Sequence, residues 1–67
     1  MSPRRLKTVL RKLRTERGMS MADLAKKASI TDAYIANLET GKKANPSLDV
    51  LKRLARALGV PVTELLE

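Results

Sequence analysis

The chain of 67 residues contains neither cysteine nor histidine, and each absence removes a class of chemistry. Without cysteine there is no disulfide, no thiol nucleophile and no thiolate ligand for zinc or an iron–sulfur cluster. Without histidine there is no imidazole for general acid–base catalysis or metal binding. The seven Asp and Glu residues are dispersed along the chain, mostly at positions where a helix is expected to begin or end. We therefore expect no enzyme, no metal and no other cofactor.

Aromatic residues and long apolar runs are also scarce. Tyr34 is the only aromatic residue, so the chain lacks the stacked rings that hold single-stranded nucleic acid or splayed RNA bases. No apolar run approaches the roughly 18 residues of a membrane span, and the basic start does not open into a signal peptide. A cytoplasmic protein without a membrane partner is expected, and any nucleic acid it binds should be a duplex.

Positive charge is abundant and unevenly distributed. The chain carries 14 Lys or Arg and a net charge of +7, and residues 1–18 hold seven of these cations against Glu16 alone. A stripe of Arg4, Lys7 and Arg11 marks one face of the first helix. This end is expected to lie near DNA or to attract it, and the alternative is a solvated helix surface. A membrane-surface peptide is disfavoured, because the apolar residues of this helix are needed to close a core.

Apolar periodicity and end signals predict one all-α domain over residues 1–67. Helix starts are signalled by three hydroxyl residues, Ser20, Thr31 and Ser47. Helix ends are signalled by three glycines, Gly18, Gly41 and Gly59. Hydrophobic residues form 43% of the chain, enough for a small core. The expected helices cover approximately residues 4–17, 21–28, 32–39, 48–58 and 62–66.

The second and third expected helices are short and joined by a tight turn, with Ala25 where they would cross. Here the sequence resembles the Cro and lambda-repressor type of helix-turn-helix, also called the XRE family. The resemblance covers residues 6–66. The matching residues are Leu10, Leu13, Arg14, Gly18, Met19, Ser20, Leu24, Ala25, Ile30, Tyr34, Ile35, Leu38, Glu39, Gly41, Lys42, Pro46, Leu51, Ala55, Leu58, Gly59, Val60 and Leu65. It implies a compact five-helix, lambda-repressor-like fold with the helix-turn-helix formed by helices two and three.

The resemblance implies that the third helix reads bases in the major groove. The base-reading positions of the family fall on Asp32, Ala33 and Asn37; Ala33 and Asn37 lie on the face opposite Ile35 and Leu38, and Asp32 flanks that face. Asp accepts a hydrogen bond from cytosine, Ala contacts the thymine methyl group and Asn pairs twice with adenine. The alternative for each is local: Ala favours helix, Asp32 complements the helix dipole and Asn37 is a solvated polar residue.

The resemblance also implies contacts to the DNA backbone, which fix register without reading sequence. These positions are Ser20, Met21, Thr31, Tyr34, Lys42, Lys43 and Asn45. Met21 stands where the family often has Gln, so its contact would come from the backbone amide at the helix start. Ser29 stands where the turn usually has a left-handed Gly, at a cost of order 1 kcal/mol. For Lys42 and Lys43 the alternative is a solvated pair, and for Tyr34 a ring that covers the edge of the core.

The family further suggests a structural ion pair between Arg14 and Glu39. The function implied is a sequence-specific regulator of transcription, a nucleoid-associated repressor that binds a palindromic duplex operator as a homodimer. The C-terminal apolar residues Val60, Val62, Leu65 and Leu66 would supply either the dimer contact or a cap on the core. The alternative function is a protein-interaction module, such as an antitoxin or a bridging factor, in which DNA binding is secondary.

Overall fold

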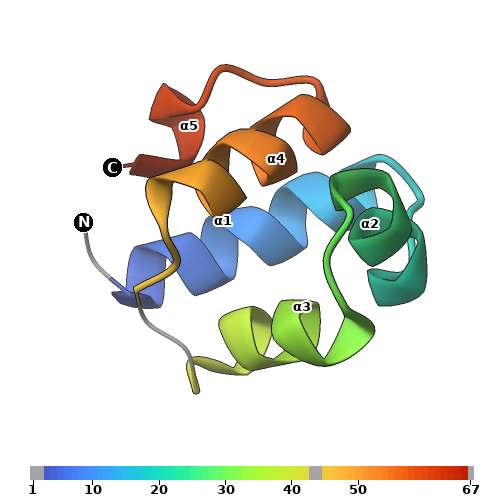
Figure 1. Ribbon diagram of the computed structural model, residues 1–67, viewed down its shortest axis with the longest axis horizontal. Helices are drawn as coiled ribbons and strands as arrows, with labels where there is room; N and C mark the ends of the chain where they lie inside the picture. Colours follow the sequence, from blue (N-terminus) through green and yellow to red (C-terminus); the bar gives the residue numbers. More distant parts are fainter. Residues whose placement is uncertain (1–2, 43–44, 67) are drawn as a thin grey trace.

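The computed structural model describes residues 3–42 and 45–66, which form five helices and no strand (Figure 1). The prediction of an all-α, five-helix fold is confirmed. The first and third helices end within one residue of the expected positions, and the last begins one residue later than expected. The helices are α1 (Pro3–Glu16), α2 (Met21–Ala28), α3 (Asp32–Thr40), α4 (Leu48–Leu58) and α5 (Thr63–Leu66). None of these helices is both long and apolar enough to cross a membrane.

The three middle helices begin in the same way, at a Ser or Thr whose side-chain oxygen accepts a backbone N–H. The oxygen of Ser20 accepts from Asp23 at 3.0 Å, that of Thr31 from Tyr34 at 3.1 Å and that of Ser47 from Val50 at 3.2 Å. Each such cap is worth about 1 kcal/mol of stability. The helix starts are therefore encoded locally, at the positions that the hydroxyl residues predict.

Helices α2 and α4 end in the same hydrogen-bonding pattern, although one ends at Ser and the other at Gly. Ser29 has φ 59° and Gly59 has φ 71°, so both are left-handed. The following residues close the turns: Ile30 donates to the Ala25 carbonyl at 2.9 Å, and Val60 donates to that of Ala55 at 3.0 Å. The expected left-handed Ser29 is confirmed, and the turn between α2 and α3 keeps its shape without glycine.

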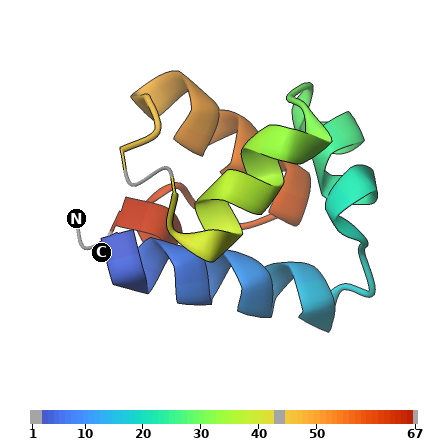
Figure 2. The same cartoon turned by 90° about the horizontal axis from the view of Figure 1, so that it is seen from below.

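The core is aliphatic and draws on all five helices. Its fully buried large side chains are Leu6, Leu10, Leu24, Ile35, Leu38, Leu54, Leu58 and Leu65. Helix α1 packs against α3 and α5, and α2 packs against α3 and α4. In Figure 2, which views the molecule from below, α3 lies on the near side, so one of its faces is directed away from the other helices. This arrangement leaves α3 available to a partner.

The C-terminal apolar segment serves mainly as a cap on the core. Leu65 is buried, and Val60 and Val62 are half-buried against the core cluster. Leu66 is the member of this segment that stays exposed, at 37%.

Candidate nucleic-acid interface

The outward face of α3 carries the residues expected to read bases. Ile35 and Leu38 are buried and fix the rotation of the helix about its axis. As a result Asp32 and Ala33 are exposed at the first turn, and Asn37 is half-buried one turn further on. Ala33 and Asn37 therefore lie on the helix face opposite the core, and Asp32 flanks that face at the start of the helix. The major groove of a duplex admits an α-helix.

The starts of α2 and α3 offer the backbone groups that suit phosphate. The first N–H groups of a helix lack intrahelical acceptors, and the helix dipole favours an anion there. Ser20 and Thr31 are exposed, and each hydroxyl oxygen already accepts the N–H of its cap. Because a hydroxyl both donates and accepts, its hydrogen can still be donated to a phosphate oxygen. Each of the two hydroxyls can thus cap its helix and bind a phosphate at the same time.

Two of the expected backbone positions have side chains that pack against the core. Met21 is half-buried and packs against the core cluster, so its side chain contributes to packing. Its backbone amide, at the first position of α2, is the group left to bind an anion. Tyr34 is likewise half-buried with its ring against the core. The sequence could identify Met21 as a departure from the family pattern, but its packing role depends on the fold.

The loop after α3 supplies exposed polar groups beside the end of α3. Lys42 and Asn45 are exposed, whereas Lys43 lies outside the described residues. Lys7 of α1 reaches the same end of α3, because its Cδ lies 3.7 Å from the position that a Cβ at Gly41 would occupy. The stripe on α1 and the loop after α3 are therefore neighbouring sources of positive charge.

Arg14 joins three parts of this site. Its Nε and Nη2 donate to the two carboxylate oxygens of Glu39 at 2.7 and 2.9 Å, and its Nη1 donates to the Met19 carbonyl at 2.7 Å. The Glu39 side chain is only 2% exposed and that of Arg14 11%. The hydrogen bond with Glu39 raises the pKa of Arg14 above its usual value. The bond to Met19, directly before the cap of α2, has no sequence signal that could have revealed it.

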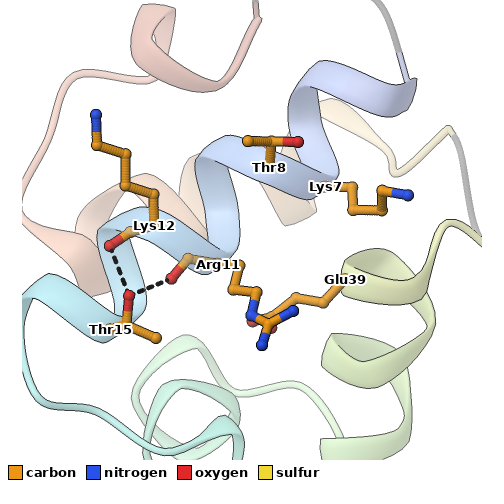
Figure 3. A pocket seen from close by; sticks show the side chains of 6 residues that line it. All are labelled: Lys7, Thr8, Arg11, Lys12, Thr15 and Glu39. Atoms are coloured by element: carbon orange, nitrogen blue, oxygen red, sulfur yellow. Dashed lines mark hydrogen bonds between the residues drawn. The ribbon is translucent and has the colours of Figure 1, made fainter.

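A groove of about 450 Å³ runs along α1 beside α3 (Figure 3). It is lined by Lys7, Thr8, Arg11, Lys12, Thr15 and Glu39. Lys12 extends to the side opposite Arg11, and Thr15 donates from its hydroxyl to the carbonyls of residues 11 and 12 at 2.9 and 3.1 Å. The groove is basic apart from Glu39, whose carboxylate Arg14 already neutralises. It extends the positive surface beside α3. In residues 3–42 and 45–66, no cluster of potential metal ligands is found.

Comparison with known sequences identifies one family. The sequence profile described as helix-turn-helix matches residues 10–65. The transcriptional regulator DdrOP3 of Deinococcus deserti is 47% identical over 58 residues, which cover 87% of this chain and 44% of that protein. The transcriptional regulator SinR of Bacillus subtilis is 33% identical over 58 residues, covering 87% of this chain and 52% of SinR. The chain thus spans about half the length of these relatives.

Comparison with solved structures finds the same fold. The structure of SinR in complex with DNA superposes with a TM-score of 0.89 at 31% identity, over 92% of this chain and 98% of that one. The restriction-modification controller protein C.AhdI of Aeromonas hydrophila gives a TM-score of 0.86 at 34% identity, over 91% of each chain. Both likenesses extend over more than nine-tenths of this chain.

Proposed function

The chain belongs to the XRE-type helix-turn-helix family, and on this premise we propose that it is a transcriptional regulator that binds double-stranded DNA. The observation that carries the proposal is the outward side of α3. Its first turn, which Thr31 caps, exposes Asp32 and Ala33, and Asn37 lies half-buried one turn further on. A solved complex of the structurally similar SinR contains DNA, which supports this assignment.

In this proposal the site divides into base readers and backbone contacts. Asp32, Ala33 and Asn37 face base edges in the major groove, which carries a distinct pattern for each base pair. The backbone amides at the starts of α2 and α3 contact phosphates and fix the register on the duplex. A second group, of side chains, contacts the DNA backbone as well. The side chains in this second group are Ser20, Thr31, Tyr34, Lys42, Lys43 and Asn45.

We further propose that the chain acts as a repressor and occupies a palindromic operator as a homodimer in the cytoplasm. One module of this size contacts too little DNA for high specificity, and two modules related by a two-fold axis double the contacts. Half-sites are then separated by about one helical turn of DNA. Leu66, which is exposed at the end of α5, is the residue of the C-terminal segment left for such a contact.

Selection of bound duplexes from a random pool at near-physiological salt tests the function. Enrichment of a palindrome with half-sites about one turn apart supports sequence-specific binding by a dimer. Enrichment of a single half-site supports base reading without the dimer. Weak, salt-sensitive binding without any enriched sequence contradicts the proposal and favours a protein-interaction module.

A further inference from the structure

A second basic surface lies where α2 and α4 end, on residues outside α3. It is a concavity of about 300 Å³ lined by Lys27, Ala28, Ser29, Arg53 and Arg56, called here the basic concavity. In Figure 1, α3 forms the lower edge of the molecule, α4 lies in the upper part and α2 lies at the right, where it packs against α4. None of the residues assigned to base or backbone contact lines this concavity. The concavity therefore shares no residue with the proposed DNA-binding face.

Part of this positive charge has a role within the fold. Arg53 donates from Nη1 to the Ser29 carbonyl at 3.3 Å and pairs with Asp49 at 3.1 Å. Cations near the end of a helix also complement its dipole, which applies to Lys27 in α2 and Arg56 in α4. Within the part of the chain that the structure describes, however, neither Lys27 nor Arg56 forms an ion pair. Two cations of the concavity therefore remain available to an external anion.

We propose that the basic concavity is a docking site for an acidic segment of a partner protein. Arginine pairs with carboxylates through two parallel hydrogen bonds, and Lys27 adds a point charge beside it. Small neighbours, Ala28 and Ser29, leave room for the incoming carboxylates. The inference goes beyond DNA binding and does not depend on it.

The surroundings of the concavity favour a short acidic segment over a second duplex. A duplex presents phosphates in long rows, and its affinity rises with the number of phosphates that it places on cations. Asp49, whose side chain is 70% exposed beside Arg53, would meet such a row with like charge. A short segment needs only one or two carboxylates, and Lys27 and Arg56, the two lining cations without an ion pair in the described residues, can take them.

A titration with a defined peptide tests the proposal on the whole chain. The probe is a short peptide of alternating Glu and Gly, and the same peptide with Gln in place of Glu is its uncharged control. Backbone amide shifts are followed by NMR at near-physiological salt. We expect the acidic peptide to shift residues 27–29 and 53–56, and the double variant K27Q/R56Q to weaken its binding about fivefold or more.

The charge-matched control is K12Q/K52Q, which removes the same charge from exposed positions outside the concavity. This variant should weaken binding less than about twofold, by diffuse attraction alone. Equal weakening by both variants overturns the proposal, as does binding of the uncharged peptide or no binding at all. A random duplex that shifts residues 53–56 at lower concentration than the peptide also overturns it, because those shifts assign the surface to DNA. Residues 27–29 are left out of this comparison, since Ser29 lies two residues before Thr31, a proposed phosphate contact. Amide spectra of both variants show whether each remains folded.

Discussion

Arg14 and Glu39 connect α1 to the end of α3 through two parallel hydrogen bonds, with N–O distances of 2.7 and 2.9 Å. The same guanidinium donates to the carbonyl of Met19, directly before the cap of α2. One side chain on α1 thus fixes both the start of α2 and the end of α3. In the proposed function these are the two elements that meet the DNA, so Arg14 positions them without reading a base.

Removing the buried carboxylate should destabilise the fold. Glu39→Ala leaves Arg14 buried without its anion, and breaking such a pair costs roughly 3 to 5 kcal/mol. Chemical denaturation measures this loss in the free energy of unfolding. The matched control is Asp49→Ala, which breaks the exposed Arg53–Asp49 pair and should cost less than about 1 kcal/mol. An unchanged unfolding midpoint for Glu39→Ala would contradict the structural role of the pair.

Replacing Ser29 with glycine should stabilise the chain. A left-handed residue with a Cβ is strained, so Ser29→Gly is expected to gain about 1 kcal/mol. The control is the reverse change at the equivalent position after α4, Gly59→Ala, where φ is 71° and a Cβ would meet no atom within 4 Å. It should lose about 1 kcal/mol through backbone strain alone. Melting of both variants checks the two signs, and a destabilised Ser29→Gly would refute the strain argument.

The capping box at the start of α2 should make the stability of the fold depend on pH in the acidic range. The Ser20 amide donates to the Asp23 carboxylate at 2.9 Å, and this bond, followed by that of the Ser20 hydroxyl, lowers the pKa of Asp23. The stabilisation is therefore complete above the unfolded pKa of about 3.9 and is lost as the pH falls through the lower folded value. In Asp23→Asn, melting temperatures recorded below pH about 4 should fall less steeply than in the native chain. An identical acid dependence in the two proteins would contradict the linkage.

Lys42, in the loop after α3, should contribute equally to the affinity for every duplex, whatever its sequence. Lys42→Gln removes one of the proposed phosphate contacts, so affinity should fall by a similar factor for specific and scrambled duplexes. The slope of log K against log salt should become shallower by about 0.9. Fluorescence anisotropy across a salt series measures both effects. Lys52→Gln, an exposed change on α4, is the control and should leave the slope nearly unchanged. A loss confined to the specific duplex would show that Lys42 reads bases instead.

Local signals explain why the fold could be predicted from the sequence. Ser20, Thr31 and Ser47 each cap the helix that begins after them, and these bonds join residues only three apart. The left-handed turn at Ser29 could also be anticipated, because its place in the helix-turn-helix motif requires that conformation. Such features depend on short stretches of backbone, which the sequence specifies directly.

Contacts between distant residues could not be predicted in the same way. The bond from Arg53 to the Ser29 carbonyl joins residues 24 apart, and the basic concavity depends on how α2 packs against α4. Likewise, Met21 shows its packing role only once the core is formed. The resemblance suggested the partner of Arg14, whereas its bond to Met19 depends on the path of the chain after α1. These features depend on contacts between residues that are far apart in the sequence and meet only in the folded chain.

The claim that α3 reads base edges is tested most directly at Asn37. The measurement is the affinity of the native chain and of Asn37→Ala for a selected duplex and for each of its single-base-pair variants. Our account predicts that the variant loses about 1 to 3 kcal/mol on the selected duplex and no longer discriminates at one base pair, while discrimination at the other positions persists. A loss of equal size on every duplex, with the base preferences unchanged, would contradict base reading by Asn37.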